Sequence, residues 1–445
     1  MKILLIRPNM VVGPALDTME PLALAILAGL TPPDVALSMC DERLEPVPFD
    51  EPTDLVALSV DTYSARRAYE IAGEYHRRGI PVVMGGAHPT LCTEEVTGYA
   101  DAAAVGDAED VWPQIVNDTR AGALKRVYRS SFPDLAGTPI DRRIFGTRRY
   151  GPIRITQFGR GCPHHCDFCS SRVCSGGLIR HRRPEDVARD VRDSDGHVFL
   201  IADDNLFADR QAGETLCAAL KPLRIRWACQ ISIDLASDAT LVAAMAASGC
   251  IMILVGFESM NSENLAQMRK GWNERHGGYE EVARIVRASG IMLYGTFVLG
   301  YAADTPETAQ ACVDLAMRLK CAIAHFNLLM PFPGTTLYER LKSEHRLIHD
   351  PWWLHPDFRF GKAVFRPRGM TAEQLEQSCL DARHAFNSIG SIARRGLDWR
   401  ANSRHAGIYL AANLACRREL DRREGARLGI KDPLAPFLSH ETPSC

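Results

Sequence analysis

Three cysteines, Cys162, Cys166 and Cys169, follow one another with the spacing C-x3-C-x2-C. Cysteine thiolates hold iron–sulfur clusters, and a four-iron cluster held by four cysteines has no open position. Three cysteines leave one iron open to a small molecule, and that open position distinguishes a catalytic cluster from one that only transfers electrons. The sequence IRITQFG at 153–159 predicts a strand. We therefore expect the cysteines on a loop where this strand ends.

A zinc knuckle is the competing interpretation of the same cysteines. Zinc sites of this kind use four ligands arranged in pairs. Cys174 together with His164, His165 or His181 offers further ligands, but their spacing does not form the second pair. We therefore favour the iron–sulfur cluster.

The composition is that of a protein with ordinary hydrophobic cores. The chain has 445 residues, of which 46% are apolar, and a net charge of −2. This length predicts two or three domains, and the charge gives no global attraction to nucleic acid or to a membrane. No apolar run approaches the ~18 residues that a membrane helix needs, and scattered cysteines suit a reducing compartment. We expect a cytoplasmic protein with no nucleic-acid or membrane partner.

Residues 1–130 read as alternating strands and helices, the pattern of an α/β domain with a Rossmann-like doubly wound parallel sheet. The expected strands lie at 2–8, 35–43, 54–60, 80–86 and 102–107. Such sheets bind ligands at the carboxyl ends of their strands. Three segments that allow close approach of a ligand lie there: SVDTYS from Ser59, GGAHPT from Gly85 and VGDAED from Val105.

The rest of the chain divides into a linker and two further domains. Residues 131–150, rich in proline, glycine and charge, read as the linker. Residues 151–335 predict a partial (β/α)6 TIM-like barrel, whose active site lies at the carboxyl ends of its strands. Its expected strands are at 153–159, 197–204, 225–232, 252–259, 292–300 and 324–332. Residues 336–445 read as mainly helical, with a poorly ordered tail from Pro433.

The cysteine motif resembles that of the radical S-adenosylmethionine (SAM) superfamily. In that family the amino and carboxylate groups of SAM occupy the open iron, and an electron from the cluster cleaves SAM to give a 5′-deoxyadenosyl radical. Phe168 also fits, since the family places an aromatic residue near the adenine. Cys162, Cys166 and Cys169 would then hold a 4Fe–4S cluster.

The three glycine-rich segments resemble the cobalamin-binding domain that precedes the cluster domain in the class B type of this superfamily. That class has a GG-x-HPT turn and a V-G-E-G-E segment, the second of which is degraded here to VGDAE. The resemblance implies contacts to cobalamin from Ser59, Thr62, Gly85, Gly86, His88, Pro89, Thr90, Gly106 and Glu109. The competing interpretation of His88 is a turn histidine that is hydrogen-bonded to the backbone. The D-x-H-x-x-G motif that supplies a histidine to cobalt elsewhere is absent, as in many members of the class.

Segments after the expected barrel strands also have counterparts in the class: ADDN, VGFES, FVLGY and PFPGTTLYERL. The resemblance places Asp203 or Asp204 near SAM or substrate, Ser232 near the ribose hydroxyls, and Glu258 near the SAM amine or ribose. A cationic ligand with a free amine needs a carboxylate nearby, and ribose needs short polar partners. The competing interpretations are helix capping for the two aspartates and a buried ion pair with an arginine for Glu258.

The resemblance implies an enzyme that uses a 4Fe–4S cluster, SAM and cobalamin. The expected reaction is methyl transfer to an unactivated carbon of a small, natural-product-like molecule, through a 5′-deoxyadenosyl radical. An external donor such as flavodoxin or ferredoxin would supply electrons. The sequence identifies no further catalytic side chain. The aromatic stretch with Trp352, Trp353, Phe358, Phe360 and Phe365 is either a lid that excludes water or plain domain packing.

Two other functions fit the same sequence. A radical SAM enzyme of this architecture can form a ring, or attach an adenosyl or aminocarboxypropyl fragment of SAM to a heteroatom acceptor. A non-catalytic sensor that binds cobalamin or a metal would give no product at all. The products formed from SAM distinguish these functions.

Overall fold

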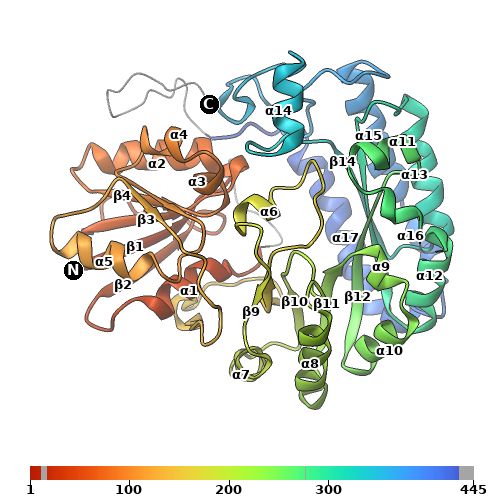
Figure 1. Ribbon diagram of the computed structural model, residues 1–445, viewed down its shortest axis with the longest axis horizontal. Helices are drawn as coiled ribbons and strands as arrows, with labels where there is room; N and C mark the ends of the chain where they lie inside the picture. The colour runs from red at the N-terminus through yellow and green to blue at the C-terminus, as the bar shows by residue number, and fades with distance from the viewer. Residues whose placement is uncertain (12–17, 276, 430–445) are drawn as a thin grey trace.

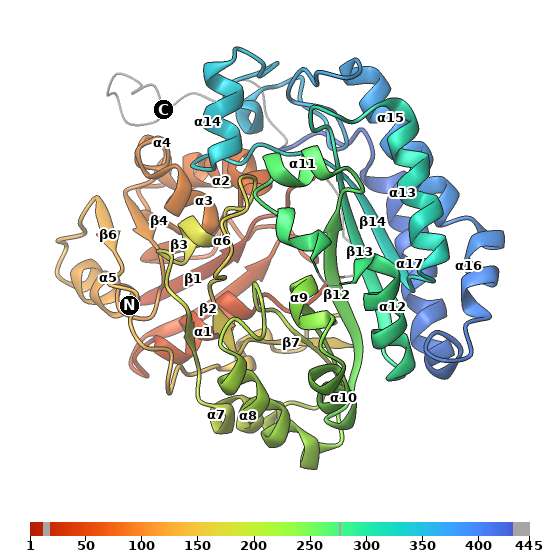
Figure 2. The same cartoon turned by 45° about the vertical axis from the view of Figure 1, so that its right-hand side comes forward.

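Two parallel sheets of six strands each form the framework of the chain, the first in its N-terminal part and the second in its middle (Figure 1). The structure is a computed structural model that describes residues 1–11, 18–275 and 277–429. The tail from Pro433, predicted to be poorly ordered, lies outside these residues. Both views place the two sheets side by side, with the C-terminal helices against the second sheet (Figures 1 and 2).

The N-terminal sheet has the strand order β2-β1-β3-β4-β5-β6, and all its strands are parallel. The strands are β1 (Lys2–Arg7), β2 (Ala36–Asp41), β3 (Leu55–Ser59), β4 (Val82–Gly85), β5 (Ala102–Val105) and β6 (Val127–Arg129). The order reverses between β1 and β3, where ligands of doubly wound sheets bind. The sequence predicts five of these strands, because β6 is too short to show a hydrophobic pattern.

Helices cover both faces of the N-terminal sheet, so its strands are buried on both sides. They are α1 (Leu22–Leu30), α2 (Ala65–His76), α3 (Ala87–Leu91), α4 (Thr93–Thr97) and α5 (Trp112–Arg120). In β1, Leu4 and Ile6 pack in the core under α2, whereas Ile3 and Leu5 pack in the core under α1 and α5. This burial explains why the strand reads as a continuous apolar run.

The second sheet has the order β14-β13-β12-β11-β10-β7, again all parallel. Its strands are β7 (Ile153–Thr156), β10 (Val198–Ile201), β11 (Arg226–Ile231), β12 (Cys250–Glu258), β13 (Met292–Leu299) and β14 (Ile323–Leu328). The first and last strands do not pair, so the curled sheet is an open half-barrel. The predicted partial barrel is confirmed, and all six strands lie within the predicted segments or extend them by one or two residues.

Helices follow the barrel strands in the order that the sequence predicts. They are α7 (Pro184–Asp193), α8 (Arg210–Leu220), α9 (Ile233–Ala236), α10 (Ala239–Ala247), α11 (Ser262–Gln267), α12 (Gly278–Ala288) and α13 (Pro306–Arg318). The side chain of Asp238 caps α10 by accepting from two backbone N–H groups, and Thr305 opens α13 with a capping box. A short hairpin of β8 (Gly159–Arg160) and β9 (Arg180–His181) flanks the cysteine segment, which also contains α6 (Ser171–Cys174).

The C-terminal part is mainly helical. It contains α14 (Thr336–Ser343), α15 (Ala372–Phe386), α16 (Ile389–Gly396) and α17 (Ala406–Arg423), and single 3-10 turns lie at Thr62–Ser64, Arg142–Phe145, Lys221–Leu223, Gly271–Glu274, Trp352–Leu354 and Ser403–His405. Ile392 and Tyr409 pack on the starts of the last barrel strands. Buried Arg395 donates to the carbonyls of Cys321 and Ala322, which fastens α16 to the barrel. Within the part of the chain that the structure describes, no helix has the length and apolar character to span a bilayer.

Candidate functional site

The three cysteines lie on the loop between β8 and α6, at the carboxyl end of the first barrel strand. Each of Cys162, Cys166 and Cys169 is partly exposed, and the Cys169 N–H donates to the Cys166 carbonyl at 3.3 Å. The hairpin that carries the loop lies between the two sheets, with α6 beside α3 (Figure 1). The loop therefore has one side toward the barrel and another toward solvent.

Two aspartates at the end of β10 hold the chain that enters this loop. Asp203 accepts hydrogen bonds from the backbone N–H groups of Phe158 (2.8 Å) and Gly159 (2.7 Å), and Asp204 accepts from that of Gly161 (2.9 Å). At Gly161 φ is +98°, and a Cβ would lie 2.0 Å from the Leu178 carbonyl oxygen, so only glycine fits. The capping interpretation of the two aspartates is wrong, because Asp209 caps α8.

Asp167 anchors the other side of the loop, a role that the sequence analysis missed. This buried residue lies between two of the cysteines and pairs with Arg340 of α14 at 2.7 Å. The Tyr301 hydroxyl, just after β13, donates to the same carboxylate at 2.5 Å. A charged residue inside the cysteine motif was the available signal, but its partners are more than 130 positions away in the sequence.

Glu258 ends β12 with a left-handed backbone (φ +63°) and is almost fully buried. Its carboxylate pairs with Lys270 Nζ at 2.9 Å, so the buried ion pair is present but the cation is a lysine rather than an arginine. Non-glycine residues with positive φ are strained and concentrate at functional sites. Burial raises the pKa of the Cys166 thiol to about 12, and the nearby Lys270 ammonium opposes that shift.

Ser232, the predicted ribose contact, lies just after β11 and beside the cluster loop. The Asn205 side-chain amide donates to its hydroxyl at 3.2 Å. Burial raises the pKa of the Cys162 thiol, while a hydrogen bond from Asn205 lowers it. Ser232, Asn205 and Cys162 are thus brought together, although they come from three different segments.

In the described ranges, the one group of three possible metal-ligand atoms within 4.8 Å of one another is His88, Cys92 and Glu95, in the N-terminal domain. The three loop cysteines do not form such a group, so the choice between an iron–sulfur cluster and zinc rests on their sequence spacing.

A cavity of about 510 Å³ lies at the carboxyl ends of β1, β3, β4 and β5. Five residues predicted to contact cobalamin line it: Ser59, Gly85, Gly86, Gly106 and Glu109. Ala57, Ala104 and other small or apolar side chains make up much of its remaining wall, and Ile155 and Ala202 of the barrel close it. The cavity therefore lies between the two sheets, and none of its described lining residues is a histidine.

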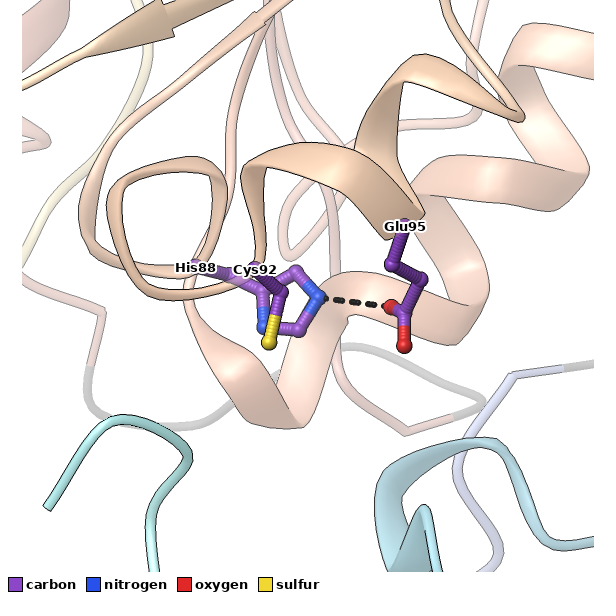
Figure 3. A group of neighbouring side chains, drawn as sticks. All are labelled: His88, Cys92 and Glu95. Carbon is purple, nitrogen blue, oxygen red and sulfur yellow. Dashed lines mark hydrogen bonds and ion pairs between the residues drawn. The ribbon is translucent and has the colours of Figure 1, made fainter. Parts of the chain in front are cut away.

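The other four residues of that prediction do not line this cavity. His88 is fully buried, and its Nε2 lies 3.0 Å from Glu95 Oε1 (Figure 3). The same Nε2 lies 3.0 Å from the Tyr69 hydroxyl, and Nδ1 lies 3.4 Å from Thr62 Oγ1. Its partners are side chains rather than the backbone expected for a turn histidine. The Trp353 indole N–H donates to Glu95, so this network joins the N-terminal domain to the aromatic stretch. Pro89 is buried, and Thr90 accepts from the Gly106 N–H at 2.9 Å.

Arg160, one residue before the loop, links the two domains across the cavity. Its guanidinium pairs with Glu109 at 2.7 Å and with Asp107 at 3.0 Å, and Arg180 also pairs with Asp107. The sequence analysis assigned Glu109 to cobalamin and did not anticipate these arginine partners. The VGDAED segment therefore holds the cluster loop as well as lining the cavity.

A second cavity, of about 240 Å³, lies beside Phe168 at the ends of β13 and β14. The aromatic rings of Tyr63, Phe332, Phe358 and Phe360 line it together with Phe168. Of the aromatic stretch, Trp352, Trp353 and Phe365 are instead fully buried in packing contacts. Domain packing is thus confirmed for some residues of the stretch, others form a cavity wall, and the lid stays a prediction.

Comparisons with known proteins show which proteins the chain is similar to. Residues 156–315 match the model of the radical SAM superfamily. The chain is 28% identical to bacteriochlorophyllide d C-12(1)-methyltransferase of Chlorobaculum tepidum over 411 residues, 88% of this chain and 89% of that protein. It is also 28% identical to the bacteriochlorophyllide d C-8(2)-methyltransferase of that organism, over 74% of this chain and 78% of the relative.

A solved structure shares the fold over most of the chain. The radical S-adenosylmethionine methyltransferase TsrM from Kitasatospora setae, with cobalamin and a 4Fe–4S cluster bound, matches with a TM-score of 0.62. The identity is 19%, and the match covers 77% of this chain and 78% of that one.

Replacing one cluster cysteine tests the ligand assignment. In Cys166→Ala we expect loss of nearly all iron after anaerobic reconstitution, with far-ultraviolet circular dichroism unchanged because the residue lies on a partly exposed loop. Cys174→Ala is the matched control and should keep its iron. Iron retained by Cys166→Ala, or lost from Cys174→Ala, contradicts the assignment.

The buried carboxyl of Asp203 predicts a pH dependence of stability. Burial raises its pKa from 3.8 to about 7, against the two backbone N–H groups that lower it. Between these values the folded state keeps a proton that the unfolded state releases, so the free energy of unfolding falls as pH rises. The free energy of unfolding of the native protein, measured relative to that of Asp203→Asn, should fall by about 1.4 kcal/mol per pH unit from pH 5 to 7. Above pH 7 this difference should level off. Denaturant unfolding of the metal-free protein measures this, and a difference that does not change with pH refutes it.

Proposed function

We propose that this chain, a member of the radical SAM superfamily, is a cobalamin-dependent methyltransferase that transfers a methyl group from SAM to an unactivated carbon of a small molecule. One observation carries the proposal: a loop with three free cysteines stands beside a cavity between a doubly wound sheet and a half-barrel. Two relatives that match 74% and 88% of the chain are methyltransferases by name, whereas two others that match 72% and 75% of it are named cyclases. We place the enzyme in a reducing cytoplasm.

The donor set fits a 4Fe–4S cluster with one open iron. Cys162, Cys166 and Cys169 would hold three irons, and the cluster supplies the electron that cleaves SAM. Asp203, Asp204 and Asp167 fix the loop, so the three thiolates keep their positions when SAM arrives. The nearby Lys270 ammonium stabilises the thiolate form that iron requires.

The cavity between the sheets fits cobalamin, which supplies a carrier for the methyl group. Its wall of small residues lets a large ring approach the backbone at Gly85, Gly86 and Gly106. None of the described residues that line the cavity is a histidine, so none of them would offer an imidazole to the cobalt. We assign Ser59 and Glu109, which line the cavity, to the cobalamin site. We assign Thr62, His88, Pro89 and Thr90 to the same region, where the His88 imidazole lies 3.4 Å from the Thr62 hydroxyl.

The reaction balances with two molecules of SAM and two electrons for each methyl group. One SAM gives its methyl group and leaves as S-adenosylhomocysteine. The other is cleaved to methionine and a 5′-deoxyadenosyl radical, which takes a hydrogen atom from the acceptor carbon and leaves as 5′-deoxyadenosine. The electrons come from an external carrier such as flavodoxin or ferredoxin.

Residues at the barrel mouth would bind SAM and keep water out. We place the SAM amine and ribose near Glu258 and Ser232, which face the loop from β12 and β11. The adenine would pack near Phe168, which also lines the aromatic cavity. That cavity is the space we assign to the acceptor, because its aromatic walls exclude water from a radical.

Products formed from SAM test the proposed reaction. With dithionite and hydroxocobalamin, the reconstituted enzyme should form 5′-deoxyadenosine and also S-adenosylhomocysteine in proportion to the cobalamin bound. Without cobalamin, S-adenosylhomocysteine should disappear. Methylthioadenosine instead would indicate aminocarboxypropyl transfer, 5′-deoxyadenosine alone would indicate ring formation, and no product would indicate a sensor.

Filling the cavity between the sheets tests the cobalamin site. Ala108→Trp places a large ring in the cavity wall, and we expect hydroxocobalamin to bind at least about tenfold more weakly, since overpacking costs about 1–3 kcal/mol. Exposed Ala136→Trp is the control. Cobalamin is measured by its absorbance after gel filtration and iron by chelation. Normal cobalamin binding by Ala108→Trp would show that cobalamin lies elsewhere.

A further inference from the structure

A hollow of about 400 Å³ lies against the cysteine loop. Two cluster cysteines, Cys166 and Cys169, form part of its floor. Exposed residues of three other segments form its rim: Val173 of α6, Arg269 after α11 and Gly334 before α14. The helix α6 packs beside α3 (Figure 1). Cys166 and Cys169 are partly exposed and line the hollow, so these two cluster ligands are accessible from it.

The charge in this hollow is positive, although the chain as a whole has a net charge of −2. Arg172 and Arg269 line it, and neither guanidinium pairs with a carboxylate among the residues that the structure describes. The one carboxylate in its wall, that of Asp167, is buried and neutralised by Arg340. Most other arginines near the site are paired, as Arg160 and Arg180 are. Arg172 and Arg269 thus differ from these arginines, because their positive charges beside the cluster ligands have no carboxylate partner in the described residues.

The surface of the hollow suits a transient protein contact. Val173 is 41% exposed and provides an apolar centre. Glycines 176, 177 and 334 also line the hollow, and the Arg172 guanidinium lies beside Gly177. Small interfaces with complementary charge associate fast and dissociate fast, as turnover by a carrier protein requires.

The residues assigned to SAM and the acceptor do not line this hollow. Glu258 pairs with Lys270, and Phe168 lines the aromatic cavity. An electron that entered past these residues would have to cross the space assigned to SAM and the acceptor. The outer hollow offers a route to the thiolates that leaves this space closed to water.

We propose that the hollow and its rim are the docking surface for an acidic one-electron carrier protein of the flavodoxin or ferredoxin class. This inference rests on the proposed function, because the electron is needed only if the loop holds a reducible cluster. The reduced carrier loses one electron and the cluster gains it, with no bond made or broken and no proton transferred at the surface. Arg172 and Arg269 attract the acidic face of the carrier and hold it over Cys166 and Cys169.

The test compares a protein reductant with a small one. The variant Arg172→Glu/Arg269→Glu reverses both charges, and Arg394→Glu, on the exposed part of distant α16, is the matched control. A bacterial flavodoxin in its fully reduced form and sodium dithionite are the two probes. Anaerobic bleaching of the cluster absorbance gives the rate of reduction, and biolayer interferometry at low and high salt gives the affinity for flavodoxin.

We expect the double variant to bind flavodoxin at least about tenfold more weakly at low salt and to be reduced by it correspondingly more slowly. Its reduction by dithionite should match that of the native protein. The control should behave like the native protein with both probes. High salt should remove most of the difference between the variants, since it screens surface charges.

A second variant shows whether a folding defect, rather than the lost charges, explains the result of the first. Thr336→Glu adds a negative charge at the rim while leaving both arginines in place, and glutamate is favourable at the first position of α14. It should also weaken flavodoxin binding and spare reduction by dithionite. Native rates with flavodoxin in both variants overturn the docking surface but leave the proposed function intact. Failure of dithionite to reduce the reconstituted native protein overturns the cluster and the docking surface together.

Discussion

The site depends on one mechanical constraint: a flexible loop must hold three thiolates rigidly while the fourth position stays open. Carboxylates from distant segments meet this constraint. Asp203 and Asp204 hold the entry of the loop through backbone N–H groups, and Asp167 holds its middle through Arg340. The hydrogen bond between Asp167 and Arg340 joins two charged groups, and such bonds are stronger than neutral ones. These buried carboxylates therefore fix the loop to the barrel and restrict its motion.

The same loop also joins the two domains. Arg160 precedes it and pairs with Glu109 of the N-terminal domain, while the His88 network reaches Trp353 beyond the barrel. One hydrophobic core runs through both domains, so the packing is continuous where these polar contacts occur. The cavity between the sheets and the cluster loop are consequently held in a fixed relation. A cofactor in the cavity and one on the loop would meet at this boundary.

The sequence predicts the elements that local patterns encode, but it does not reveal contacts between residues that are far apart in the chain. Buried parallel strands, helix caps such as Asp238 and the cysteine spacing can be read directly, because each signal lies within a few residues. The sequence placed His88 at the cofactor, whereas its side chain is saturated by partners in a buried network. Glu258 was predicted to lie near the SAM amine or ribose, and its ion pair with Lys270 was not anticipated. These partners are brought together only by tertiary packing, which a single sequence does not display.

The central claim is that one iron of the cluster is left without a protein ligand. Mössbauer spectroscopy of protein reconstituted with ⁵⁷Fe, recorded before and after SAM is added, tests this most directly. The account predicts that one iron in four shifts to the parameters of a site with a higher coordination number, while three keep their sulfur environment. Four irons that remain equivalent and unaffected by SAM would contradict it.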